Sequence, residues 1–228
     1  MPEVIGPARL ESAAAALGVA LDPDQVAALV AFAELLLRWN RTFNLISRRD
    51  VERLLPRHLL DSLSVAPLLR GGRVMDLGTG AGLPGVPLAI ARKDLAFTLV
   101  DRSGRKIRFV DRAVRELGLG NVETRCADVR ELPGDLRFDT VVSRAVADLA
   151  TAWALAAPRL ETGGRLVVMH RVQGEEDATV IAPPSSRVLD RRSVHIAGLE
   201  RPHDIVVLGA ADDRCDALPG DDNARDGP

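Results

Sequence analysis

The chain has few of the residues that build metal sites and disulfide frameworks. Among its 228 residues are two cysteines, Cys126 and Cys215, whose wide separation fits neither a zinc-binding spacing nor a disulfide pattern. No Ser-His-Asp set, pair of catalytic carboxylates or cluster of metal ligands is evident in the sequence. We therefore expect a protein of a reducing compartment that holds no metal, with a chemistry that needs none of these devices.

Long apolar runs and a charged leader followed by an apolar stretch are also missing. Their absence predicts neither secretion nor membrane insertion, so we expect a cytoplasmic protein with no membrane partner. Lysine is scarce as well, since Lys93 and Lys106 are the only lysines among 30 basic residues. We interpret the excess of arginine, together with the abundant alanine, as genomic codon bias rather than as selection for phosphate binding.

The net charge of −2 is unevenly distributed along the chain. Residues 211–228 contain six aspartates and two arginines, a net charge of −4, which leaves about +2 for residues 1–210. The tail is expected to be disordered, because it is charged and has few apolar residues. The remaining chain is mildly basic, which the whole-chain value conceals.

The most informative stretch is 72–86, in which Asp76 is set in a short apolar run and four glycines follow: Gly78, Gly80, Gly82 and Gly85. After them the apolar spacing becomes helical, so the pattern predicts a strand, a tight glycine turn and a helix. Glycine is needed where φ is positive or where a ligand approaches too closely for a Cβ. A small molecule lying against this turn is therefore favoured over a tight turn with no ligand.

Two cofactors fit this turn. Gly80, Gly82 and Gly85 match the dinucleotide fingerprint, with Asp101 near the usual distance for an acid that binds ribose. However, Pro84 lies where the helix opens and has no N–H to offer a pyrophosphate. An acid followed by Gly-x-Gly-x-Gly is typical of S-adenosylmethionine (SAM) sites, and SAM carries no phosphate. The stretch therefore favours SAM over a dinucleotide.

Strands and helices alternate after the glycine turn. We predict helices over 84–92, 103–117 and 148–160 and strands over 96–100, 121–126, 138–142 and 165–169. This order is typical of a doubly wound, mostly parallel sheet. Two further strands, over 187–197 and 204–209, have a short connection that suggests an antiparallel pair at one edge. The predicted organisation is a helical extension packed on the core (1–70), a SAM-binding domain (71–210) and an acidic disordered tail (211–228).

Ligands of such sheets bind beyond the carboxyl ends of the strands. Asp101 is placed there to accept hydrogen bonds from ribose hydroxyls, although it could instead cap its strand. The backbone at Val129 and Arg130 could frame an adenine edge. Arg144 follows the fourth strand, where a methyltransferase receives its target, or it could pair with a carboxylate across the site.

Two upstream segments add candidates. A helix with Asp22 as its N-cap and Pro23 at its first position is predicted to run to about Trp39. Trp39 with Phe43 could pack on the core or stack on an RNA base. In the next helical stretch, over 50–70 and interrupted at Pro56, Arg57 and Asp61 are spaced i, i+4. His58 and Asp61 are spaced i, i+3. These residues could form a surface ion pair and a satisfied histidine, or serve the substrate side.

Five stretches together resemble the RsmG (GidB) family of 16S ribosomal RNA guanine-N7 methyltransferases: 37–47, 57–62, 74–89, 138–145 and 201–208. The resemblance runs from about residue 10 to 209. It implies a class I SAM-dependent methyltransferase fold, Rossmann-like, with a seven-stranded, mostly parallel sheet and an N-terminal helical extension. It also implies a cytoplasmic enzyme, expected to be a monomer, that methylates N7 of a guanine (position 527, in the 530 loop) and releases S-adenosylhomocysteine.

The predicted site follows from the residue patterns and from this resemblance. Candidates for cofactor contact are Asp76, Gly78, Gly80, Leu83, Asp101, Val129, Arg130 and Arg144. Candidates for RNA contact are Arg57, His58, Arg144, His170 and Arg171, with Arg144, Asp61 and His58 nearest the target base. No residue is assigned as a general base, since transfer to a ring nitrogen requires positioning alone.

Two positions depart from the family pattern. The family usually has glutamate where this chain has Arg130, a change that a backbone contact would survive and a side-chain contact would not. Lys-Gly usually stands where this chain has His170-Arg171. The expected partner is small-subunit ribosomal RNA or the 30S particle. Alternatives are a methyltransferase of another RNA or of a small molecule, a non-catalytic RNA-binding protein and, more remotely, an NAD oxidoreductase.

Overall fold

The computed structural model describes residues 6–144, 148–170 and 181–212. Its helices are α1 (Pro7–Ala16), α2 (Pro23–Phe43), α3 (Arg48–Val51), α4 (Asp61–Leu63), α5 (Gly85–Ala91), α6 (Gly104–Glu116) and α7 (Leu149–Ala156). A π-helical segment η1 (Leu55–Leu60) and three 3₁₀ turns, η2 (Ala66–Leu68), η3 (Val129–Glu131) and η4 (Ala157–Arg159), complete the helical elements of the described chain.

Seven strands form a single sheet in the order β3-β2-β1-β4-β5-β7-β6. They are β1 (Arg73–Leu77), β2 (Ala96–Asp101), β3 (Val122–Cys126), β4 (Phe138–Arg144), β5 (Leu160–His170), β6 (Ser186–Val194) and β7 (His203–Ala210). The first five strands pair in parallel, whereas β7 is antiparallel to both β5 and β6. The predicted α/β class, the mostly parallel seven-stranded sheet and the antiparallel pair at one edge are confirmed.

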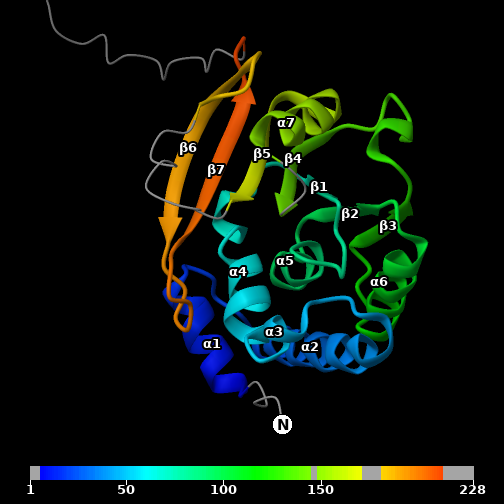
Figure 1. Cartoon of the computed structure of the whole chain (residues 1–228), viewed down its shortest axis with the longest axis vertical. Helices are drawn as coiled ribbons and strands as arrows, with labels where there is room; N and C mark the ends of the chain where they lie inside the picture. Colours follow the sequence, from blue (N-terminus) through cyan, green and yellow to red (C-terminus); the bar gives the residue numbers. More distant parts are fainter. Residues whose placement is uncertain (1–5, 145–147, 171–180, 213–228) are drawn as a thin grey trace, which may run out of the picture.

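Alternating side chains of the strands pack into two cores, one on each face of the sheet. Helices cover both faces (Figure 1). On β1, Val74 packs with the N-terminal helices, α5 and α6, while Met75 packs with α7 and η3. Since successive residues of a strand point to opposite faces, a strand covered on both faces is apolar throughout. The buried Asp76, next to the last residue of β1, is therefore an exception that needs an explanation.

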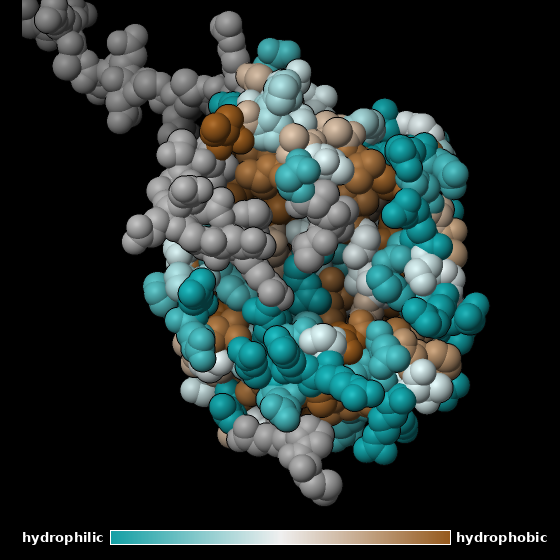
Figure 2. Space-filling view, in the orientation of Figure 1, coloured by the Kyte–Doolittle hydropathy of each residue, from teal (hydrophilic) through white to brown (hydrophobic). Residues whose placement is uncertain are grey.

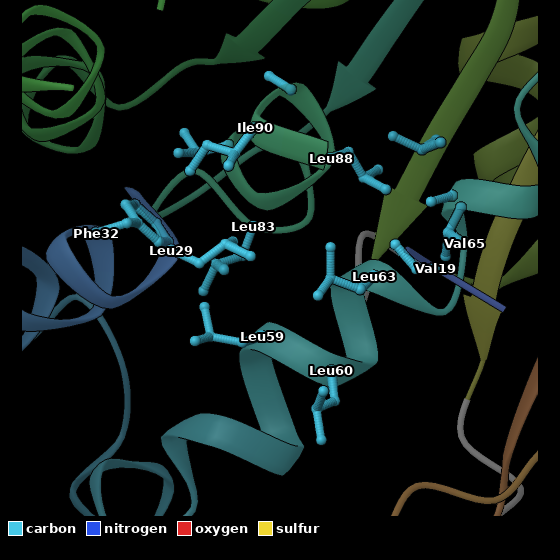
Figure 3. Packing of buried hydrophobic residues seen from close by; sticks show 14 of the residues in the cluster. Val19, Leu29, Phe32, Leu59, Leu60, Leu63, Val65, Leu83, Leu88 and Ile90 are labelled. Carbon is cyan, nitrogen blue, oxygen red and sulfur yellow. The ribbon is translucent and has the colours of Figure 1, made fainter. Parts of the chain in front are cut away.

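The helices before β1 share the core of the sheet. Figure 3 shows Leu29 and Phe32 of α2 directed toward Leu83 and Ile90, and Leu59 of η1 near them. The first helices thus cover the glycine turn and α5. The predicted division of the chain into an extension and a SAM-binding domain stays a prediction, and the acidic tail from 213 onward lies outside the described residues.

Two helix ends differ from the sequence prediction. Helix α2 continues four residues beyond Trp39 to Phe43, because Asn44 takes the left-handed conformation (φ 48°) that ends a helix and Asn40 Oδ1 accepts from the N–H of Ile46. Helix α7 ends at Ala156 instead of 160, because Pro158 has no N–H for an α-helical bond, and a 3₁₀ turn follows.

Candidate functional site

A cavity of about 550 Å³ opens at the carboxyl ends of the parallel strands. It is lined by the glycine turn after β1, the ends of β2, β3 and β4, η3, α7 and the segment between α2 and α3. Figure 2 shows the face of the molecule that is turned to the viewer in Figure 1, and this face is hollowed near its middle. Hydrophilic side chains gather over its lower part, where Figure 1 places α2 and α3. The volume lies within the roughly 300–1,000 Å³ of typical small-molecule sites.

The glycine turn leaves space for a ligand at Gly80. Its φ of +59° is strained for other residues, and a Cβ there would meet no protein atom closer than 3.9 Å. The N–H of Gly80 donates to Asp101 Oδ2 at 2.9 Å, which ties the turn to the end of β2. Backbone and carboxylate thus form one wall of the cavity, with room beside them.

Asp101 presents its carboxylate at this wall. Oδ1 accepts from the N–H of Ser103 at 2.8 Å, and Lys106 Nζ lies 3.7 Å from Oδ2. The lysine partly balances the charge, and each carboxylate oxygen still has a lone pair for a further donor. A ligand hydroxyl at the end of β2 would find an acceptor there.

Asp76 lies in the core beside the glycine turn. It is fully buried and does not line the cavity. Oδ2 accepts from Thr79 Oγ1 at 2.6 Å and from the N–H of Gly85 at 2.8 Å, so the carboxylate joins the two ends of the glycine turn. Oδ1 has no hydrogen-bond partner. Direct contact of Asp76 with a cofactor remains a prediction, whereas its role in shaping the turn is visible in these bonds.

Burial raises the pKa of Asp76 to about 6, against the opposing effect of the bonds from Thr79 and Gly85. A raised pKa in the folded protein means that ionisation of this acid destabilises the fold, and that the loss develops as pH rises from about 4 through about 6.

We therefore expect Asp76→Asn to gain stability relative to wild type as pH rises. An asparagine can keep both accepted bonds through its carbonyl oxygen and needs no ionisation. Between pH 4.5 and pH 8 the difference in unfolding free energy should move by roughly 2 kcal/mol in favour of the variant. Urea unfolding of both proteins at the two pH values measures this, and a difference that is independent of pH would contradict it.

Asp128 and Arg130 also line the cavity, at the start of η3. Arg130 Nε and Nη2 lie 2.9 and 2.7 Å from the two carboxylate oxygens of Asp128, and Arg102 Nη1 lies 3.7 Å from Oδ2. The hydrogen bonds from Arg130 hold the pKa of Asp128 well below its usual range. Arg130 is thus directed along the protein surface to Asp128, and its backbone N–H donates to the same carboxylate at 3.0 Å.

The wall from the N-terminal part consists of Leu45 and Ile46, which follow α2. Trp39 stands behind them and packs against Phe43 and Phe109, with ring centroids 5.1 and 5.6 Å away. Trp39 is also part of the packing around the buried core. The core-packing alternative for Trp39 is confirmed, and the two aliphatic residues beside it supply the cavity wall.

Arg144, at the end of β4, lines the cavity on the side of η1 and α4. Its Nη1 lies 3.1 Å from His58 Nδ1 and 3.6 Å from Asp61 Oδ2. Burial lowers the pKa of Arg144, while the charges of Asp61 and Asp76 oppose the shift. Burial, followed by the charge of Arg144, lowers the pKa of His58 to about 4, so this histidine is neutral near pH 7. Arg144 therefore both pairs with a carboxylate, that of Asp61, and lines the cavity, so the two alternatives suggested for it occur together.

The i, i+4 pair of Arg57 and Asp61 that the sequence suggested does not form. Residues 55–60 are π-helical, with Pro56 near their start, so the α-helical spacing does not apply there. Arg57 Nε lies 3.2 Å from Asp50 Oδ1 instead, and Asp61 faces Arg144. Arg57, His58 and Asp61 all lie behind the cavity wall rather than on it.

His203 belongs to this cluster and was not among the predicted site residues. Its Nδ1 lies 2.6 Å from Asp61 Oδ1, and its Nε2 lies 3.4 Å from Arg57 Nη1. Its position in the matching stretch 201–208 was the available signal, but a distance of 142 residues to Asp61 concealed the contact. Lys106, Leu45 and Ile46 were likewise missed as cavity residues.

Of the predicted cofactor residues, seven line the cavity together: Gly78, Gly80, Leu83, Asp101, Val129, Arg130 and Arg144. Among the predicted RNA residues, His170 ends β5 and Arg171 lies outside the described residues. Within 6–144, 148–170 and 181–212, no cluster of three metal-ligating side chains occurs. Nor does any helix of this part of the chain have the length and apolar character to cross a bilayer.

Residues 25–200 match a family model described as GidB, rRNA small subunit methyltransferase G. A protein named ribosomal RNA small subunit methyltransferase G from Chromohalobacter salexigens is 43% identical over 193 residues, which cover 84% of this chain and 91% of that protein. A protein of the same name from Escherichia coli is 37% identical over 195 residues, 85% of this chain and 93% of that protein.

Solved structures resemble the chain in fold. The glycopeptide N-methyltransferase MtfA has a TM-score of 0.52 at 14% identity, over 68% of this chain and 96% of that one. The ribosomal protein L11 methylase from Lactobacillus delbrueckii subsp. bulgaricus has a TM-score of 0.51 at 15% identity, over 66% and 79%. At such low identity these similarities show a class I methyltransferase fold and nothing about the substrate.

Proposed function

The chain belongs to the GidB family, rRNA small subunit methyltransferase G, and from this membership we propose that it methylates N7 of a guanine in the 530 loop (position 527) of 16S ribosomal RNA. That it is a SAM-dependent ribosomal RNA methyltransferase follows from the family. The nucleotide, the ring atom, the residues in contact and the product S-adenosylhomocysteine are our proposal.

The observation that carries the proposal is the composition of the cavity. A glycine turn with open space at Gly80 stands beside the carboxylate of Asp101, and Arg144 lines the same cavity. SAM would lie with its ribose hydroxyls at Asp101, its adenine near Val129 and Arg130, and its methionine part at the turn with Gly78. SAM supplies a methyl group already activated by the sulfonium, so the protein has to align the acceptor and exclude water.

We expect Asp101→Ala to weaken SAM binding by about 10- to 100-fold, the loss typical of a hydrogen bond to a charged group. The substitution also removes the acceptor that holds the N–H of Gly80. Calorimetric titration of the purified protein with SAM measures this, with Asp94→Ala as the control. Asp94 is also an acid paired with a basic side chain, but it precedes β2 at the other end of the strand. Equal affinity of the two variants would contradict the assignment.

A guanine N7 requires a particular arrangement on the target side. Its lone pair must point at the methyl group, so a donor that bonded N7 would block the reaction. Arg144 would therefore contact the base at its neighbouring oxygen O6, or contact the cofactor. Methylation leaves the base with a positive charge, which the buried carboxylates of Asp61 and Asp76 would help to stabilise. No general base is needed, because N7 has no proton to lose.

The RNA would approach from the side of Arg144, with Arg57 and His58 behind it and His170 at the end of β5. Arg171, the next residue in the sequence, is also a proposed RNA contact. Arginine pairs with phosphate oxygens and carries its charge at every physiological pH. His170, which stands where the family usually has lysine, would contribute charge only under acidic conditions, and Arg171 beside it in the sequence would compensate. A cytoplasmic monomer acting on ribosomal RNA or on the 30S particle is part of this proposal.

The test is transfer of a labelled methyl group from SAM to small-subunit RNA, and to 30S particles, that lack the modification. We expect incorporation at one guanine, identified by mass spectrometry of nuclease fragments. Modification of another nucleotide would favour another RNA substrate, and modification of neither substrate would overturn the proposal. If calorimetry also detected no SAM binding, a non-catalytic RNA-binding protein would be favoured.

A further inference from the structure

A line of polar contacts runs from strand β7 to the cavity. His203 Nδ1 lies 2.6 Å from Asp61 Oδ1, and the other oxygen of Asp61 lies 3.6 Å from Arg144 Nη1. The side chain of Asp61 is 6% exposed, that of His203 12% and that of Arg144 20%. Of the three, Arg144 lines the cavity. His203 and Asp61 can therefore affect a bound ligand through Arg144.

The donors in this line fix the tautomers of both histidines. A guanidinium can only donate, so His203 Nε2, 3.4 Å from Arg57 Nη1, is the accepting nitrogen. The proton of neutral His203 then resides on Nδ1 and is donated to Asp61. By the same reasoning His58 Nδ1 accepts from Arg144, and its proton resides on Nε2. In each histidine, the nitrogen that carries the proton and the nitrogen that accepts are thus assigned.

When both histidines are neutral, the positive charges of the two arginines, Arg57 and Arg144, equal the negative charges of the two aspartates, Asp50 and Asp61. Arg57 contacts Asp50, and Arg144 contacts Asp61. A buried carboxylate with one oxygen bonded can still rotate about its side chain, and the second bond prevents that rotation. His203, at the start of β7, supplies this second bond, because β7 begins beside η1 and α4. The orientation of Asp61, and so of Arg144, depends on it.

We propose that His203 is a positioning residue for methyl transfer: its Nδ1–H fixes Asp61, and Asp61 in turn holds Arg144 on the target side of the cavity. This rests on the proposed function, since Arg144 is assigned there to the cofactor and the target base. The residue after His203 is Asp204, which lies opposite His170 in the register of β5 and β7. The end of β5 with the proposed RNA contact His170 thus lies beside the start of β7, which carries the residue that supports Arg144 through Asp61.

Two substitutions of similar polarity separate this role from a structural one. The side-chain amide nitrogen of asparagine takes nearly the place of Nδ1 and can donate to Asp61. The amide nitrogen of glutamine reaches the place of Nε2 and leaves Asp61 Oδ1 without its donor. We expect His203→Gln to lower kcat by up to about 100-fold at saturating SAM and RNA, and His203→Asn to stay within a few-fold of wild type.

Thermal unfolding accompanies the kinetics, so that a loss of folded protein is recognised. Equal kcat for His203→Gln and wild type overturns the proposal, as does an Asn variant as slow as the Gln variant. The tautomer provides a readout without activity: nitrogen-15 NMR of the ligand-free protein should show His203 protonated at Nδ1, and protonation at Nε2 alone overturns the proposal. A wild-type protein that methylates no ribosomal RNA overturns the proposed function, whereas the NMR result still decides whether His203 holds Asp61.

Discussion

Replacement of Arg144 by methionine should abolish most of the methyl transfer, by about 100-fold or more, and should also destabilise the protein. The catalytic loss is expected because the variant lacks the guanidinium that faces the cavity. The loss of stability is expected because Asp61 would keep its buried charge without the nearby cation, a change that typically costs about 3 kcal/mol. Single-turnover transfer to unmodified small-subunit RNA measures the first effect, and urea unfolding measures the second.

Arg144→Lys separates the two effects. Nη1 alone makes the contacts to Asp61 and His58, so a lysine can keep the positive charge there, but it lacks the rest of the planar guanidinium that lines the cavity. It should therefore recover most of the stability and little of the activity. Arg115→Gln, an exposed arginine near the end of α6, is the matched control and should change neither. Wild-type rates in the methionine variant would remove Arg144 from the site.

Replacement of Gly85 by alanine should damage the cofactor site and lower stability by about 1–3 kcal/mol. A Cβ at this position would lie 2.3 Å from Leu99 Cδ2 and 2.6 Å from Asp76 Oδ2, both fully buried. The helix propensity of alanine favours the change by about 1 kcal/mol. The clash exceeds this gain, because Leu99 and Asp76 are confined by the core and cannot move aside.

The same clash should weaken SAM binding at least about 10-fold, since Asp76 holds the two ends of the turn through Thr79 and Gly85. Calorimetry and thermal unfolding measure the two effects. Gly120→Ala is the control, because a Cβ there meets nothing within 4 Å and the residue has no positive φ. A Gly85 variant that is as stable as the Gly120 variant and binds SAM as tightly would show that the turn tolerates displacement of Asp76.

Much of the fold was predictable, because its signals are local. Asp22 and Pro23 begin α2 as expected, with a capping box completed by Gln25. The apolar runs that became β1, β2 and β4 are short and bounded by turns, and alternation with helices implies a parallel sheet. The glycine turn was likewise predictable, since positive φ and close packing act within a few residues.

The site was predictable in part. Asp101, Val129 and Arg144 lie at the ends of different strands, and the rule that strand ends converge brought them to one cavity. The bonds of Asp76 were not predictable from that rule. Its place in the motif predicts a ligand contact, which stays a prediction, whereas the structure shows its buried carboxylate accepting bonds from Thr79 and Gly85.

The sequence by itself determined the class of fold, the glycine turn and the family, because each depends on residues close together in the chain. The tertiary structure decided which partners the polar residues have. Arg57 pairs with Asp50 instead of Asp61, since η1 is π-helical, and Asp61 pairs with Arg144 and His203 from distant strands. Such contacts form because the sheet places β4 and β7 beside the helices, and this arrangement cannot be predicted from residues that are close together in the sequence.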